Sequence, residues 1–213
     1  GNLLAILSHH VDDLPVFANM EEFSRLLKGL QEEYEVKVTE DPKLLLGANI
    51  QTGEDHILFH QVAYIERVLE EFELTNANSV CAPSTKIPIV PSKEDWDPLE
   101  GETFPYRRIV GQINWIANML RPDVAFYANI LARALIRPTR DHFELAKSVL
   151  RYLKGTKDYC LKFSAPTDNS KVIKLEVYGD SDLGGNEGKE STYGYLVLAN
   201  NQVIDWKSKR IGT

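Results

Sequence analysis

The sequence predicts a mixed α+β fold. Short apolar runs separated by turn residues occupy both ends of the chain, which is the pattern of antiparallel strands. In the middle, apolar residues recur every three or four positions, as they do on one face of a helix. The 213 residues are 43% hydrophobic and 26% charged. This is the composition of a globular protein that is long enough to bury a full core.

The first expected element is a pair of strands over residues 3–7 and 14–18, joined by a polar turn. Pro15 cannot donate a hydrogen bond to a ladder, so the second strand is expected to be an edge or an irregular strand. Asn19 then caps a helix, and Glu22 is placed for the reciprocal half of a capping box.

Three more strands are expected near residues 35–39, 43–51 and 55–60, with a tight turn between the last two. Apolar residues at helical spacing predict a helix over residues 64–72. The proline-rich residues 82–105 have no sustained period and are expected to form an irregular crossover loop.

Three helices are expected over residues 106–119, 122–136 and 139–154. Pro122 suits a first helical position, where its missing N–H costs nothing, and Thr139 can cap the third helix.

Four short strands are expected to follow, near residues 159–163, 172–178, 193–198 and 203–206. Asn200-Asn201 lies between the last two, and asparagine tolerates the positive φ of a tight hairpin turn.

The two cysteines, Cys81 and Cys160, have no metal-ligand spacing. We expect both to be free thiols in a reducing compartment, with Cys160 buried in an apolar strand. No apolar run is long enough to span a bilayer, and the start has no secretory pattern. The sequence therefore predicts an intracellular protein without a membrane segment.

The net charge of -7 argues against binding of a polyanion. However, residues 106–154 contain nine basic and three acidic residues, so they carry +6 and the remainder of the chain carries -13. Four of the basic residues fall on one side of the helix expected over residues 139–154: Arg140, Lys147, Arg151 and Lys154. This side is either a nucleic-acid phosphate contact or an ordinary solvated helix face.

Two adjacent carboxylates, Asp12 and Asp13, lie in the turn between the first two strands. They repel each other unless a cation lies between them, and Mg2+ binds one or two carboxylates together with substrate phosphates. The alternative is that Asp12 and Asp13 are simply polar turn residues.

Several motifs then occur in one order across nearly the whole chain. His10-Val11-Asp12-Asp13 resembles the aromatic-x-Asp-Asp signature of reverse transcriptases, in the form found in copia/Ty-type retrotransposons. Later segments are similar to further parts of the same Pol polyprotein: Leu44–Ile50, Tyr106–Gly111, Arg121–Ala125, Val149–Thr156, Tyr178–Gly185, Ser191–Tyr195 and Asp205–Lys209.

The resemblance implies three parts. Residues 1–60 would be the C-terminal part of a reverse-transcriptase palm, and residues 61–157 a helical thumb or connection. Residues 158–213 would be truncated RNase H-like antiparallel strands. In the parent protein this implies template-directed DNA synthesis by a two-metal mechanism.

The resemblance also implies roles for single residues. Asp12 and Asp13 would bind Mg2+ at the polymerase site, and Asp180 would bind metal at a second site that cuts RNA in a hybrid. An RNA/DNA template-primer duplex would contact the following residues: Leu46, Gly47, Arg140, Lys147, Arg151 and Lys154.

The sequence also departs from the family. His10 replaces the aromatic residue, and the chain contains neither the upstream palm aspartate nor the later RNase H carboxylates. We therefore expect no polymerase activity from the isolated chain. The alternative function is a non-catalytic, domesticated binding or regulatory module that binds a protein partner or itself. A relic without function is the third possibility. The expected location is the cytoplasm, in a virus-like particle, or the nucleus.

Overall fold

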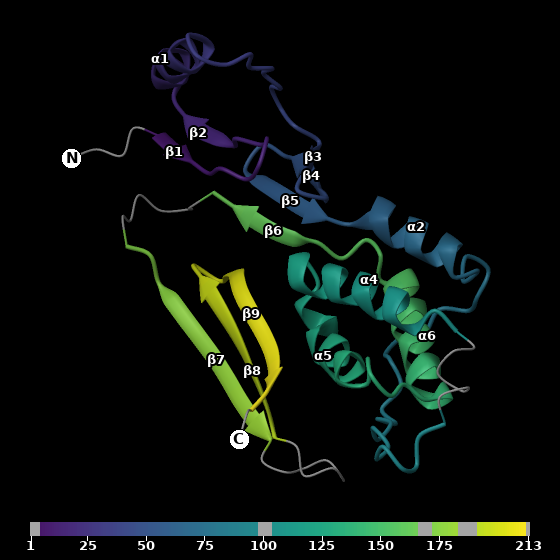
Figure 1. Cartoon of the computed structure of the whole chain (residues 1–213). Helices are drawn as coiled ribbons and strands as arrows, with labels where there is room; N and C mark the ends of the chain where they lie inside the picture. Colours follow the sequence, from purple (N-terminus) through teal and green to yellow (C-terminus); the bar gives the residue numbers. More distant parts are fainter. Residues whose placement is uncertain (1–4, 98–103, 166–171, 183–190, 212–213) are drawn as a thin grey trace. The chain divides into compact units, whose positions relative to one another are not determined.

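The computed structural model describes residues 5–97, 104–165, 172–182 and 191–211. The chain forms two compact units, Gly1–Pro42 and Lys43–Thr213 (Figure 1). Helices and antiparallel strands both occur, so the α+β prediction is confirmed. Among the residues described, no helix has both the length and the apolar character needed to cross a membrane.

The first unit is a β-hairpin followed by a helix. Strand β1 (Ala5–Leu7) pairs antiparallel with β2 (Val16–Ala18), and helix α1 (Met20–Gln31) follows. None of residues 5–42 is buried. Because a two-stranded hairpin is marginally stable in water, this unit has little stability of its own.

The cap of α1 is only partly as predicted. The Asn19 Oδ1 atom accepts a hydrogen bond from the Glu22 N–H at 2.9 Å, which confirms the N-cap. The carboxylate of Glu22 instead accepts from Arg25 Nε at 2.9 Å, so the predicted capping box is wrong. The predicted strand over residues 35–39 is also wrong, because these residues pair with no other strand.

The second unit begins with a four-stranded antiparallel sheet in the order β3-β4-β5-β6. The first three strands are β3 (Leu44–Leu45), β4 (Ala48–Thr52) and β5 (His56–His60). The single strand predicted over residues 43–51 is therefore a hairpin. Strand β6 (Leu161–Ser164) comes from a distant part of the chain and pairs with β5, with Leu161 opposite Phe59.

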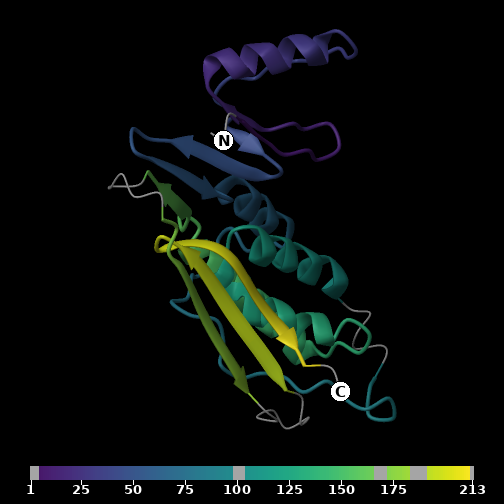
Figure 2. The same ribbon diagram turned by 90° about the vertical axis from the view of Figure 1, so that its left-hand side faces the viewer.

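Between β5 and β6 the chain forms a helical core (Figures 1 and 2). Its helices are α2 (Val62–Glu71), α4 (Tyr106–Met119), the 3-10 turn η1 (Pro122–Val124), α5 (Ala125–Arg133) and α6 (Arg140–Gly155). Apolar residues at spacings of three and four bury one face of each long helix, as periodicity predicts. The fully buried residues include Ile109, Ile113, Ile116, Val149, Leu150 and Leu153.

The helix boundaries lie within two residues of the prediction in α2, α4 and α6, and differ more over residues 122–136. Pro122 does begin a helical turn, but this turn is 3-10, and α5 ends at Arg133 rather than at residue 136. Thr139 caps α6 as predicted, in a capping box whose second member is His142. In the predicted crossover loop, residues 82–97, 104 and 105 form neither helix nor strand, and residues 98–103 lie outside the described part.

A three-stranded antiparallel sheet ends the chain, in the order β7-β8-β9. Its strands are β7 (Leu175–Asp182), β8 (Thr192–Ala199) and β9 (Gln202–Arg210), so all three are longer than predicted, and β7 also begins later in the chain. Asn200 and Asn201 have φ values of 49° and 62°, which confirms the predicted tight hairpin.

Cys160 is not buried. It is exposed and lies one residue before β6, so its side chain is not one of those that alternate between the two faces of the sheet. The prediction of a buried thiol was therefore wrong, because the strand begins one residue later.

Gly47 lies in the β3–β4 turn. Leu46 and Gly47 both have positive φ, 50° and 81°, which is the pattern of a type I′ turn. A Cβ atom added to Gly47 would lie 3.1 Å from Cζ2 of Trp115 in α4. Both the backbone conformation and the contact with Trp115 therefore require glycine.

We predict that Gly47→Ala lowers the free energy of unfolding by about 1–2 kcal/mol, because alanine is strained at this φ and its methyl group displaces Trp115. Gly111→Ala is the matched control, since Gly111 lies inside α4 and its added Cβ would meet nothing within 4 Å. This control should raise stability by about 0.5–1 kcal/mol. Urea unfolding followed by circular dichroism measures both. Equal effects of the two substitutions would contradict the role of the turn.

Candidate metal hairpin and nucleic-acid interface

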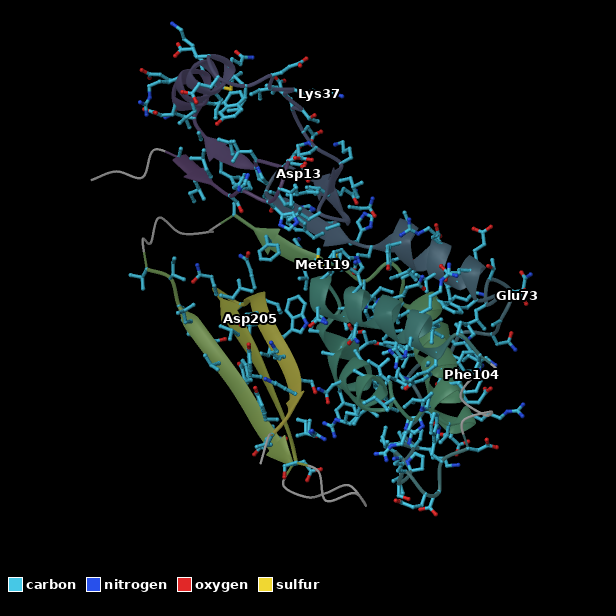
Figure 3. All side chains as sticks on the ribbon, viewed as in Figure 1. Asp13, Lys37, Glu73, Phe104, Met119 and Asp205 are labelled. Carbon is cyan, nitrogen blue, oxygen red and sulfur yellow. The ribbon has the colours of Figure 1, made fainter. Side chains whose placement is uncertain are left out.

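The turn between β1 and β2 presents Asp12 and Asp13 to solvent (Asp13 is labelled in Figure 3). His10 and Asp13 exchange both backbone hydrogen bonds at 2.9 Å, so Val11 and Asp12 are the two central residues of the turn. Only Val11 has a positive φ, 52°, which is the pattern of a type II′ turn.

Val11 is strained in this conformation, because a β-branched residue at positive φ is an outlier. Such strain costs on the order of 1–3 kcal/mol and persists only where the surrounding structure imposes it. Here the reciprocal bonds of His10 and Asp13 impose it. The side chain of Val11 is 74% exposed, so packing of this side chain does not compensate for the strain.

The two carboxylates match Mg2+ in kind, because Mg2+ prefers oxygen ligands and takes one or two carboxylates with phosphates. Within the described ranges, however, no three or more His, Cys, Asp or Glu residues form a group that could hold a metal. The hairpin itself therefore offers two adjacent carboxylates, and within residues 5–42, the described part of its own unit, no further residue joins them in a metal-binding group.

Asp180 lies within β7, two residues before its end, rather than beyond the strand as predicted. It is opposite Gly194 in the ladder, and its Oδ1 atom accepts a hydrogen bond from the Ser181 N–H at 2.8 Å. Asp182, two residues further on, lies on the same side of the strand, and both residues are exposed.

The predicted basic face of α6 is largely occupied by the chain itself. Lys154 Nζ donates to the carbonyl oxygens of Thr75 and Ala77, at 2.6 and 2.7 Å. Arg151 Nε donates to the Asn78 carbonyl at 2.6 Å. These two side chains hold the segment that follows α2 against α6.

The other half of this face is more open. Lys147 Nζ lies 3.0 Å from the carboxylate of Glu144 and 4.6 Å from the centre of the Phe143 ring. Arg140 is exposed at the start of α6. Of the four predicted phosphate-binding residues, Arg151 and Lys154 thus bind the backbone of this chain, Lys147 pairs with Glu144, and Arg140 is exposed.

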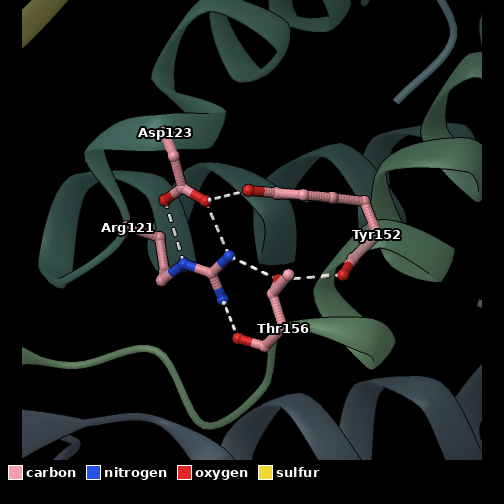
Figure 4. A network of polar contacts seen from close by, with 4 residues as sticks. All are labelled: Arg121, Asp123, Tyr152 and Thr156. Atoms are coloured by element: carbon pink, nitrogen blue, oxygen red, sulfur yellow. Dashed lines mark hydrogen bonds and ion pairs between the residues drawn. The ribbon is translucent and has the colours of Figure 1, made fainter. Parts of the chain in front are cut away.

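Arg121 has a structural role that the sequence did not reveal. We counted it among the basic residues of the middle segment, yet its side chain is only 2% exposed. Figure 4 shows its contacts: Nε and Nη2 donate to the two carboxylate oxygens of Asp123 at 2.9 and 2.7 Å. Nη1 and Nη2 donate to the carbonyl and the hydroxyl of Thr156 at 2.9 and 2.7 Å.

The carboxylate of Asp123 also accepts a hydrogen bond from the Tyr152 hydroxyl at 2.8 Å. Burial by itself would raise the pKa of Asp123, but the hydrogen bonds and the positive charge of Arg121 outweigh it and lower this pKa. Burial raises the pKa of Tyr152, and its bond to Asp123 adds to that effect. The sequence feature that could have indicated this ion pair is the position of Arg121 and Asp123 on either side of Pro122.

Comparison with known proteins agrees with the motif order. The chain is 31% identical, over 98% of its length, to the Pol polyprotein of transposon TNT 1-94 from Nicotiana tabacum. It is 32% identical, over 95% of its length, to the putative transposon Ty5-1 protein of Saccharomyces cerevisiae. Relatives 28–32% identical over nearly the whole chain are thus named as proteins of copia/Ty-type retrotransposons, which confirms the predicted resemblance. This retroelement-derived sequence covers 16% of the tobacco polyprotein and 65% of the yeast protein.

A third relative has a different kind of name. The secreted RxLR effector protein 161 of Plasmopara viticola is 36% identical over 51% of this chain, and the match covers 75% of the effector. No protein-family profile matches the chain. No solved structure matches it either.

The lowered pKa of Asp123 predicts a pH dependence of stability. Its pKa in the folded state lies below the ordinary value of 3.8, so folding favours the ionised carboxylate. This contribution is complete above about pH 6, well above the ordinary value, and is lost as the pH falls through the folded-state value. The stability difference between the unmodified chain and Asp123→Asn should therefore shrink between about pH 6 and about pH 3.

Thermal unfolding across this pH range measures the difference. Tyr152→Phe, which removes one donor to the same carboxylate, should show a smaller effect of the same sign. A stability difference that stays constant down to the lowest pH would mean that Asp123 is not held ionised by Arg121.

Proposed function

We propose that this chain is a reverse transcriptase and RNase H segment of a retrotransposon Pol polyprotein, and that its parent protein copies a template into DNA. The observation that carries the proposal is the β1–β2 hairpin, which presents Asp12 and Asp13 at the tip of a two-residue turn. The order of the motifs along the chain supports it, as does the relation to Pol polyproteins.

In this proposal the hairpin contributes two carboxylates to Mg2+ binding. Bound Mg2+ would supply a Lewis acid for phosphoryl transfer. The contribution of the chain is to fix the ligand backbone, because the His10–Asp13 bonds and the positive φ of Val11 define the turn before any ion binds. Water and the phosphates of a bound nucleotide would complete the coordination, since Mg2+ rarely takes all its ligands from protein.

The β3–β4 hairpin and α6 would contact nucleic acid. Leu46 and Gly47 form a narrow two-residue turn, which would lie against the primer backbone. On α6, Arg140 and Lys147 are the better candidates for direct phosphate contact. Arg151 and Lys154 would add positive potential, because their donors already bind carbonyl groups. The β7–β9 sheet, with Asp180 on β7, would then be the first part of the RNase H fold.

The second candidate function is a non-catalytic binding or regulatory module. Two observations favour it: within residues 5–42 no third carboxylate joins Asp12 and Asp13, and half of the basic face binds the chain itself. A relative named as an effector protein supports the use of this scaffold outside a polyprotein.

We predict that Mg2+ binds weakly at the β1–β2 hairpin. In NMR titration of the unmodified chain, the amides of Asp12 and Asp13 should shift on addition of Mg2+. Asp12→Asn combined with Asp13→Asn should abolish the shifts, because an amide oxygen carries no charge. Glu32→Gln combined with Glu33→Gln is the matched control, since these adjacent carboxylates follow α1 in the same unit. Shifts that survive the aspartate substitutions would refute the metal assignment.

We also predict that the purified 213-residue chain does not extend a primer on an RNA or DNA template with Mg2+ and nucleotides. Two adjacent carboxylates cannot hold two ions in the geometry of a two-metal site. Primer extension that disappears with Asp12→Asn and Asp13→Asn would show that the chain contains a complete site. The absence of extension combined with Mg2+ binding at the hairpin would support the segment proposal over the binding-module alternative.

A further inference from the structure

The β7–β9 sheet has one face toward the helices and one face away from them. Trp206 Nε1 donates to the carbonyl of Ala117 in α4 at 2.8 Å, and Arg133 of α5 donates to the Thr192 hydroxyl at 2.7 Å. Because side chains alternate along a strand, the even-numbered residues of β8 and the Trp206 side of β9 therefore face the helices. Figure 2 shows the three strands in front of these helices.

The opposite face combines aromatic and basic side chains. On β8 it presents Tyr193 and Tyr195, which are half-buried, and on β9 it presents Lys207 and Lys209, which are exposed. The ladder pairs Tyr193 with Lys209 and Tyr195 with Lys207. We call these four residues the Tyr/Lys face.

The neighbouring positions on β7 are small. Gly179 is opposite Tyr195 and Ser181 is opposite Tyr193, so no bulky side chain from β7 lies beside either ring. A Cβ atom added to Gly179 would meet only the Gly194 carbonyl, at 3.8 Å. Among the described residues, the direct β7 neighbours of both tyrosines are therefore small.

One acidic residue also lies on this side. Asp205 accepts a hydrogen bond from the Tyr195 hydroxyl at 3.1 Å, which holds the far end of that ring while leaving its flat surface uncovered by the bond. With two lysines and one aspartate, the face keeps a net positive charge on a chain whose overall charge is -7.

We propose that the Tyr/Lys face binds single-stranded nucleic acid, with two bases stacked on Tyr193 and Tyr195 and the adjoining phosphates at Lys207 and Lys209. Tyrosines two positions apart on a strand are separated by roughly 6.6 Å, a spacing that suits successive unpaired bases. Stacking on aromatic side chains of a sheet with nearby cations is a general mode of single-strand recognition. A duplex is excluded from this mode, because its bases are already stacked within the helix.

The proposal goes beyond the function proposed above. It concerns a different unit of the chain from the metal hairpin, an unpaired strand instead of a hybrid, and an interaction that needs no Mg2+. An experiment can therefore disprove single-strand binding by this face without disproving the proposed function, and the reverse.

The test is fluorescence anisotropy of a labelled 12-nucleotide oligo(U) with the full chain at low salt and without Mg2+. Tyr193→Ala combined with Tyr195→Ala should weaken binding by roughly 5- to 100-fold for each ring, the effect of losing one stacked base. Tyr193→Phe with Tyr195→Phe should bind nearly as well as the unmodified chain, because stacking does not use the hydroxyl.

The charge contribution is tested separately. Two phosphate contacts predict a log–log salt slope of about -1.4, which should approach zero in Lys207→Gln with Lys209→Gln. Lys37→Gln with Lys93→Gln makes the same charge change at exposed lysines that are not part of this sheet, and it should leave binding unchanged.

Circular dichroism checks the fold of each variant. If an alanine variant unfolds, an NMR titration of the unmodified chain with oligo(U) replaces it. In that titration, oligo(U) should shift the NMR signals of Tyr193 and Tyr195 but not those of Tyr34 and Tyr64.

The proposal is overturned by absence of oligo(U) binding, by binding that the alanine pair leaves intact, or by tighter binding of a 12-base-pair duplex. The lysine and tyrosine pairs would in those cases be an ordinary solvated sheet surface.

Discussion

The helical core depends on one buried cation. Arg121 lies where α4 ends and η1 begins, and its guanidinium joins this corner to Thr156 at the end of α6. Removing a charge from water costs several kcal/mol unless the site supplies partners. Here the bidentate bond to Asp123 supplies the opposite charge, and the rings of Tyr152 and Tyr159 lie 5.7 and 5.2 Å from the guanidinium carbon. The position of α6, and therefore of its basic face, follows from this bond.

Several basic side chains of this chain bind groups within the fold, so the number of basic residues overestimates the positive charge at the surface. The middle segment has an excess of basic residues, yet Arg121 is buried in an ion pair, and Arg151 and Lys154 bind carbonyl groups between residues 75 and 78. These side chains satisfy backbone acceptors that follow α2, where the helix itself provides no donors. Less positive charge is therefore directed at solvent than the sequence suggests.

The sequence predicted those elements whose signals are local. The helical spacing of Ile109, Ile113 and Ile116 placed α4, and Asn200-Asn201 placed the β8–β9 turn. The split of residues 43–51 into β3 and β4 was missed, because it depends on the positive φ of Leu46, a residue type that does not favour this conformation. The sequence also placed Asp12 and Asp13 in a turn. Whether they bind metal depends on which other ligands lie near them in the folded protein. The spacing of residues along the sequence does not give that information.

Strands β5 and β6 pair with each other although all the helices of the core lie between them in the sequence. Phe59 and Leu161 are direct ladder partners, so the chain between them leaves the sheet and returns to the adjacent position. The helical core is in effect a long insertion within a β-hairpin. Closing so long a loop is entropically costly for an unfolded chain, but a folded helical core brings its two ends together. The sheet is thus expected to form after the helices during folding. A loss of the helical core would separate β5 from β6 even if neither strand were changed.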